Sequence, residues 1–172
     1  MLTKVKILAG RAGLLAAMTA AVMAAPLPAA HSAAGLADLG GQWRGTGTDR
    51  DSGSEQPQPV QCQATNRAQG DQVQIVTVCD GPNGREEISA NLKIDGDRLT
   101  GKMTRRSPDL PFAVSGSVSG SNAGNRTTFD VRALFKTRAR VVVAVQSAQS
   151  YRLTVTDPED GATLMNVQFR KA

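Results

Sequence analysis

The stretch Cys62-Gln-Ala-Thr-Asn-Arg-Ala-Gln-Gly-Asp-Gln-Val-Gln-Ile-Val-Thr-Val-Cys79 contains a complete β-hairpin with a cysteine at each end. Gly70-Asp71 suits a two-residue type II′ loop, because glycine fills the first central position, where φ is positive. Pairing then runs outward from Gln69 and Gln72 and places Cys62 opposite Cys79. That site is non-hydrogen-bonded, with facing Cα atoms about 4.5 Å apart, inside the disulfide range of about 4.4 to 6.8 Å. The sequence therefore predicts a cross-strand disulfide.

Alternation of apolar and polar residues continues through the rest of the chain, between clusters of Gly, Pro, Asn and Asp. Helical periodicity is nearly absent after residue 35, which is typical of an all-β protein. A short helical turn is expected within Ala33–Leu39. The predicted strands, in the order of an antiparallel meander, are 40–48, 58–66, 72–80, 86–94, 97–105, 112–119, 126–135, 138–147, 150–156 and 162–170.

A second hairpin is indicated by Asp95-Gly96, which favours a type I′ turn. This turn pairs Ile94 with Asp97 and Leu92 with Leu99, so one face of the hairpin is apolar and the other is polar. Two architectures accommodate such strands. A closed barrel removes its edges, whereas a sandwich must protect them. The short loops between successive strands favour the barrel.

Residues 1–32 have the features of a Sec-type signal peptide. Lys4, Lys6 and Arg11 precede an apolar run, Gly13–Ala25, that is too short to span a bilayer. Cleavage is expected after Ser32, with Ala24 as the second choice. An uncleaved amphipathic anchor is the weaker alternative because the apolar run has no polar face, and a lipoprotein anchor is excluded because no cysteine lies near the cut. The prediction is a periplasmic or secreted protein whose residues 33–172 form one barrel domain.

Loss of this leader changes the charge and the available chemistry. It removes three basic residues and leaves 17 basic against 15 acidic, a net charge of +2 in place of +5. A balanced surface with few aromatic residues argues against nucleic acid as a partner. The only histidine, His31, leaves too, so imidazole bases, Ser-His-Asp systems and histidine-bound metal or haem are excluded. We therefore expect no enzyme activity, no cofactor, no metal and no membrane span.

The first predicted strand carries a family resemblance. Gly41-Gln42-Trp43 near the start of an exported all-β chain resembles the calycin superfamily of lipocalin-like barrels. The resemblance implies a small lipocalin-like barrel of eight to ten strands with one disulfide. It also implies that Trp43 closes the barrel floor and that a terminal cation, Arg170 or Lys171, covers the indole. Such a cation–π contact contributes around 0.5 to 2 kcal/mol.

Two branches of that superfamily are similar over the first third of the chain. The bacterial periplasmic protease-inhibitor family shares, in order, Gln42, Trp43, Cys62 and Cys79. The haem-binding ten-stranded barrels share a Leu-x-x-Leu-x-Gly-x-Trp-x-Gly-x-Gly pattern with residues 36–47. Their haem needs an axial histidine, which the processed chain lacks, so haem binding is not implied.

Two further groups of charged residues have competing interpretations. The segment from Asp49 to Glu55 superficially resembles a calcium loop, but it lacks the third acidic ligand and the distal glutamate, so we interpret it as a solvated loop over one barrel mouth. The second group consists of five arginines on neighbouring strands. These arginines could form a patch that binds an anionic partner, but the favoured interpretation is that they protect strand edges and aid solubility. They are Arg126, Arg132, Arg138, Arg140 and Arg152.

The sequence thus favours a monomeric, non-enzymatic binding protein for a small apolar ligand or a protein partner. A ligand cavity would be lined by Val114, Phe129, Val131, Leu153 and Val167. One alternative is an inhibitor of a secreted protease that acts through Ala33–Leu39 or the 49–59 loop. Another is a structural protein of the cell envelope.

Overall fold

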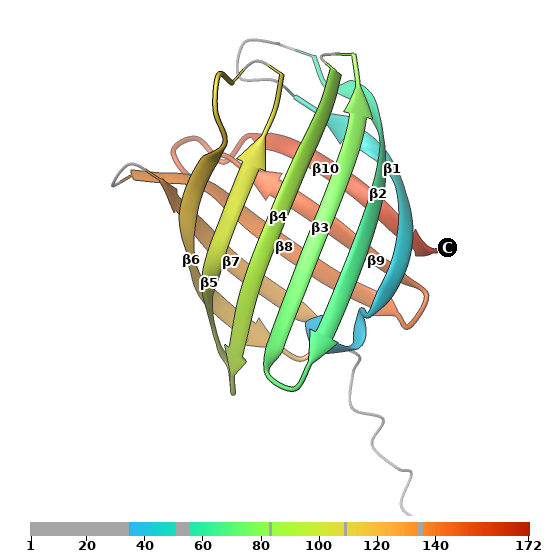
Figure 1. Ribbon diagram of the computed structural model, residues 1–172, viewed down its shortest axis with the longest axis vertical. Coiled ribbons are helices and arrows are strands. Elements are labelled where there is room, and N and C mark those ends of the chain that lie inside the picture. The colour runs from blue at the N-terminus through green and yellow to red at the C-terminus, as the bar shows by residue number, and fades with distance from the viewer. Residues whose placement is uncertain (1–34, 51–55, 83, 109, 134–135) are drawn as a thin grey trace, which may run out of the picture. The chain divides into compact units, whose positions relative to one another are not determined.

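In a computed structural model of the chain, the described residues form ten β-strands (Figure 1). The structure describes residues 35–50, 56–82, 84–108, 110–133 and 136–172. The elements are the 3-10 turn η1 (Leu36–Asp38), β1 (Gly41–Asp49), β2 (Gln58–Gln69), β3 (Gln72–Gly81), β4 (Gly84–Asp95), β5 (Arg98–Arg106), β6 (Val114–Ala123), β7 (Arg126–Ala133), β8 (Lys136–Ser147), β9 (Ser150–Thr156) and β10 (Thr163–Lys171).

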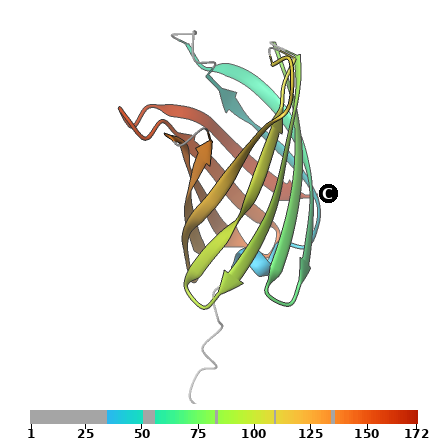
Figure 2. The ribbon, with the colours of Figure 1, turned by 60° about the vertical axis from the view of Figure 1, so that its left-hand side comes forward.

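Each strand pairs in antiparallel fashion with the next, and β1 pairs with β10, so the meander closes into a barrel (Figures 1 and 2). This confirms the predicted all-β antiparallel barrel. The ten predicted strands are all present, with ends displaced by a few residues. The predicted strand 112–119 begins too early, because β6 starts at Val114 and leaves Phe112 exposed before the strand.

The first hairpin has the predicted register. Gln69 pairs with Gln72, Cys62 pairs with Cys79, and Gly70 has a φ of 60°. The two cysteines form a disulfide with a Cα–Cα distance of 4.1 Å. The glycine conformation and the cysteine pairing, which were inferred from separate signals, therefore agree in the structure.

The second hairpin has a different register from the predicted one. Its loop is Gly96-Asp97, with Asp95 paired to Arg98 and Leu92 paired to Gly101. Gly96 has a φ of 57°, so glycine again occupies the first loop position, as it does in the first hairpin. The shift amounts to two residues, which leaves every side chain on its predicted face because side chains alternate with a period of two.

Inward-facing side chains form one core inside the barrel. The core includes residues from all ten strands and from the segment before β1, where Leu36 and Leu39 are each 1% exposed. Asp38 holds η1 by accepting a 2.7 Å hydrogen bond from the Gly35 amide. The η1 turn lies across one end of the barrel (Figure 2). No helix in the described part of the chain has the length and hydropathy needed to cross a bilayer.

Closure between β1 and β10 requires a residue without a side chain at position 45. Gly45 pairs with Phe169, and a Cβ added to Gly45 would lie 2.7 Å from both the Phe169 ring and the Val167 side chain. Both neighbours are buried in the core and have little freedom to move. The glycine therefore makes room for the β10 side chains at the seam of the barrel.

We expect that replacing both cysteines, in the double variant Cys62→Ala/Cys79→Ala, lowers the free energy of unfolding by about 3 kcal/mol. The bond closes a loop with a sequence separation of 17, which restricts the unfolded chain. Urea unfolding followed by tryptophan fluorescence measures the change. Equal stability of the variant and the oxidised parent would contradict the structural role of the bond.

At the seam, Gly45→Ala is expected to reduce stability by about 1 to 3 kcal/mol, the usual range for overpacking a core. Gly40→Ala is the matched control, since a Cβ added there meets nothing within 4 Å. Thermal unfolding of both variants separates steric conflict from the general effect of removing a glycine. A similar melting temperature for both would show that β1 tolerates a side chain at the seam.

Candidate functional site

The meander places two kinds of connection at opposite ends of the barrel. The turns after β2, β4, β6 and β8 lie at the end closed by η1, which we call the floor. The connections after β1, β3, β5, β7 and β9 lie at the other end, which we call the mouth. Loops on a rigid scaffold commonly carry function.

Three aromatic rings pack together at the floor. Trp43 and Tyr151 meet edge to face with centroids 4.9 Å apart, and Tyr151 stacks on Phe169 at 4.7 Å. The indole Nε1 of Trp43 donates a 2.9 Å hydrogen bond to the Leu39 carbonyl oxygen. This bond ties the segment before β1 to the core and, with Leu36 and Leu39 buried, closes the floor with apolar side chains.

A cation covers the tryptophan, and it is Lys171. The Lys171 ammonium lies 5.6 Å from the centroid of the Trp43 ring, and the two residues are paired across β1 and β10. Arg170 directly precedes Lys171 on β10, so its side chain points to the opposite face of the strand. It pairs with Arg44 and is exposed on the outer wall. Of the two cations that the family resemblance implied, the structure therefore places the lysine at the floor.

The five predicted ligand-lining residues all face the interior of the barrel, on β6, β7, β9 and β10. Phe129, Val131 and Val167 are at most 5% exposed and belong to the packed core. Side chains lining a space large enough for water would keep accessible surface there. Val114 and Leu153 are partly exposed, and Leu153 packs against the core from its margin.

Charged residues occupy the inner wall at the mouth. Glu86 on β4 faces Cys79 of the disulfide, and Arg105 on β5 lies next to it. The guanidinium of Arg105 donates two hydrogen bonds to the Glu86 carboxylate, at 2.6 and 3.1 Å. The Glu86 side chain is 13% exposed and that of Arg105 is 44% exposed, so the pair is partly desolvated. Bidentate geometry makes this ion pair directional as well as attractive.

A small cavity of about 40 Å³ lies beside this ion pair. Its lining comes from the ends of β1 to β5 and the connections between them. The lining residues are Asp49, Gln58, Val60, Cys79, Gly81, Pro82, Gly84, Glu86, Arg105, Ser107 and Pro108. Its volume is close to that of one water molecule, which occupies about 30 Å³ of liquid, so the cavity does not accommodate a drug-sized ligand.

The connection after β5 presents an exposed aromatic ring at the mouth. Phe112 is 72% exposed and is the large hydrophobic residue that stands out at the surface of the described chain. The segment turns at Leu110, whose amide donates a 3.1 Å hydrogen bond to the Ser107 carbonyl oxygen. Pro108 and Pro111 lack the amide proton that a ladder needs. These prolines were the available sequence signal that Phe112 precedes the strand.

A buried polar residue lies near the floor aromatics. Asn66 is 3% exposed, and its amide nitrogen and oxygen have no hydrogen-bond partner within the described residues. Burial raises the pKa of the Tyr151 phenol well above its usual value, and the neighbouring Asn66 side chain opposes part of the rise. The phenol is therefore neutral across the physiological pH range.

The calcium-like segment and the segment before β1 are only partly described by the structure. Asp51 and Glu55 of the calcium-like segment lie outside the described residues, and within those residues no group of three or more His, Cys, Asp or Glu is placed to hold a metal ion. The part of Ala33–Leu39 that is described is tied to the floor through Leu36 and Leu39.

Comparison of the chain with protein-family models, with curated proteins and with solved structures gives no match. The function has to be argued from the geometry of the mouth and the outer wall.

The single tyrosine allows a test of the floor by pH. Because folding raises the pKa of Tyr151, the unfolded chain loses the phenol proton first, near pH 10. The contribution of the Tyr151 phenol to the free energy of unfolding is fully present below that pH and decreases as the pH rises above it. Phenolate absorbance should therefore appear only together with alkaline unfolding. A phenol that titrates near pH 10 in the folded protein would contradict its burial.

Proposed function

We propose that the protein is an exported, monomeric, non-enzymatic binding protein that engages a protein partner through the rim of its barrel mouth. The observation that carries this proposal is the exposed Phe112 ring on the connection between β5 and β6, whose Pro108 lines the cavity next to the Glu86–Arg105 pair. Signal-peptide cleavage and export, as expected from residues 1–32, are part of the same proposal.

A rim site fits the packing of the barrel better than an interior ligand site does. The core side chains Leu99 and Val167 are 0% exposed, and the cavity beside the ion pair measures about 40 Å³. Ligand pockets usually measure about 300 to 1,000 Å³. An apolar ligand among the fully buried side chains would have to displace them, at the cost of the burial that stabilises the fold.

The rim combines the chemistry of a protein-binding hot spot. Exposed aromatic residues surrounded by polar groups commonly dominate protein–protein affinity. Pro108 lines the same cavity as Glu86 and Arg105, so the connection that carries Phe112 begins next to the ion pair. The ring would supply the buried area and the ion pair would orient the partner.

Protease inhibition is a narrower form of this proposal. Leu36 and Leu39 are buried at the floor, so the segment Ala33–Leu39 could insert these two side chains into a protease cleft only by withdrawing them from the core. The mouth connections are the remaining surface for that role.

Two features support the proposed kinship with calycin-like barrels. They are the Trp43 ring at the floor, covered by Lys171, and the closed meander of ten strands.

The experiment places a photo-crosslinking amino acid at position 112 and, as a control, at Lys102, which is exposed on the outer wall. Both variants are expressed in the source organism. We expect one discrete protein adduct from position 112 and none from position 102, and we expect Phe112→Ser to abolish binding of the identified partner without changing the melting temperature. Native mass spectrometry that instead finds a stoichiometric small molecule, with no adduct, would overturn the proposal.

A further inference from the structure

Three consecutive strands of the wall contain no acidic residue. β8, β9 and β10 include six cations and not one Asp or Glu. The next strand around the barrel, β1, adds Arg44 on its outer face, and the acid that it contains, Asp49, lies at the mouth end. With 15 acids in the whole chain, this segregation leaves one side of the wall strongly positive.

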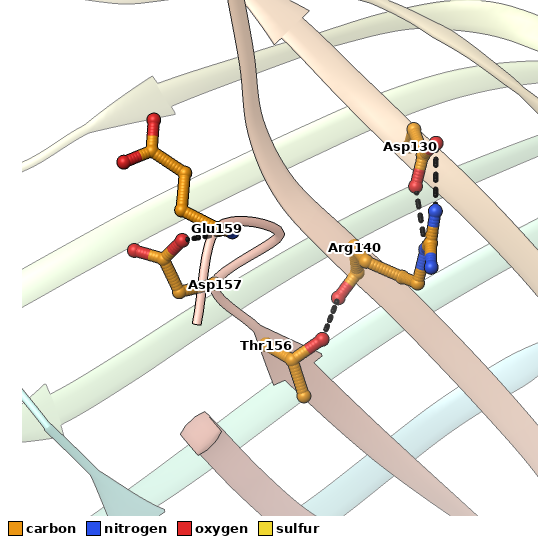
Figure 3. Close-up of polar contacts among 5 residues, drawn as sticks. All are labelled: Asp130, Arg140, Thr156, Asp157 and Glu159. Atoms are coloured by element: carbon orange, nitrogen blue, oxygen red, sulfur yellow. Dashed lines mark hydrogen bonds and ion pairs between the residues drawn. The ribbon is translucent and has the colours of Figure 1, made fainter. Parts of the chain in front are cut away.

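Some cations elsewhere on the described wall have carboxylate partners. Arg85 pairs with Asp80, Lys93 with Asp71, and Arg105 with Glu86. Arg140 on β8 reaches across to Asp130 on β7 in a bidentate pair (Figure 3), and this contact lowers the pKa of the Asp130 carboxyl. By contrast, Arg44, Arg152 and Arg170 form no ion pair with any residue of the described chain.

The register brings these three arginines together near the floor end of the wall. Arg44 and Arg170 are directly opposed on β1 and β10, and Arg152 is opposed to Gln168, two residues from Arg170. Facing Cβ atoms in an antiparallel pair are about 4.5 to 5.5 Å apart, and like charges at that spacing repel each other. The arrangement therefore costs stability in the absence of an anion.

Protection of strand edges does not explain this arrangement. Cations that block an exposed edge are useful only where an edge exists. Here β1 and β10 pair with each other along their length, so the arginines lie over a closed seam.

Hydrogen-bonding groups surround Arg152 and Arg170. A shallow depression of about 590 Å³ on the outer wall is lined by Gln146, Ser147, Gln149, Ser150, Arg152, Gln168, Arg170 and Lys171. Gln168 donates a 2.8 Å hydrogen bond to Gln146 and accepts one of 3.3 Å from Arg152. The depression thus contains three cations, five amide or hydroxyl side chains, and no carboxylate side chain.

We propose that this basic wall surface, defined as Arg44, Arg152, Arg170 and Lys171, binds an acidic polysaccharide. Cations in a row that crosses several strands suit a linear polyanion, and amides and hydroxyls suit sugar hydroxyl groups. The depression has no aromatic residue to stack a nucleobase. It also has no large apolar side chain to insert into a bilayer. This surface is separate from the mouth rim.

The test measures binding of the purified protein to alginate, a polyuronate, with uncharged dextran as the blank. We expect Arg152→Glu/Arg170→Glu to weaken alginate binding roughly tenfold or more and to flatten its salt dependence, because two contacts with the polyanion are lost. The matched control is Arg98→Glu/Lys102→Glu on β5, which changes net charge equally at exposed positions and should weaken binding less than about twofold. The neutral pair Arg152→Gln/Arg170→Gln should show an intermediate loss.

Several results would overturn the proposal. Equal losses in the two glutamate variants would show that net charge alone drives binding. Tighter binding to duplex DNA or to anionic lipid vesicles than to alginate, per unit charge, would assign the surface to another class of partner. An absence of alginate binding at physiological salt would remove the site altogether. Phe112→Ser should leave alginate binding intact, so failure at the wall and failure at the rim are distinguishable.

Discussion

Pairing of the first strand with the last is the constraint on which the rest of the structure depends. The β1–β10 ladder runs from Trp43–Lys171 to Asp49–Met165 and turns an open meander into a closed wall. It requires Gly45, because Phe169 and Val167 occupy the space that a side chain there would take. Closure is what separates an inside from an outside, satisfies the backbone groups of both terminal strands and gives the barrel two distinct ends.

The two ends are built for different purposes. The floor is filled by the buried side chains of Leu36 and Leu39 and by the aromatic rings packed around Tyr151. The mouth has a bidentate ion pair on its inner wall and an exposed phenylalanine on its rim. A packed lower core holds the strands in place, and a fixed wall lets short connections present side chains at low entropic cost. This division supports recognition at the rim in preference to storage of a ligand within.

Closure of the barrel also changes the role that charged residues on the outer wall can have. In an open sheet, arginines on the terminal strands would discourage edge-to-edge association. In a barrel, Arg44 and Arg170 lie opposite each other on a continuous surface, with no acidic residue on β8, β9 or β10. The repulsion between them is offset when an anion binds, so a small loss of stability in the free protein becomes affinity for a polyanion.

Local patterns determined much of the fold. Alternation with a period of two located ten strands and their inward faces, and the Gly70-Asp71 turn with Cys62 and Cys79 determined one hairpin and its disulfide, because these signals act between residues close in the chain. Turn chemistry alone did not distinguish Asp95-Gly96 from Gly96-Asp97 as the second loop, since either choice keeps the side chains on the same faces.

Tertiary structure decided the features that require residues distant in the chain to meet. These features are the closure of β1 on β10, the position of Lys171 rather than Arg170 over Trp43, the packing of Phe129 and Val167 into the core, and the contact of Glu86 with Arg105. Side-chain volumes and cross-barrel distances set these outcomes, and neither is encoded in the spacing of residues along one strand.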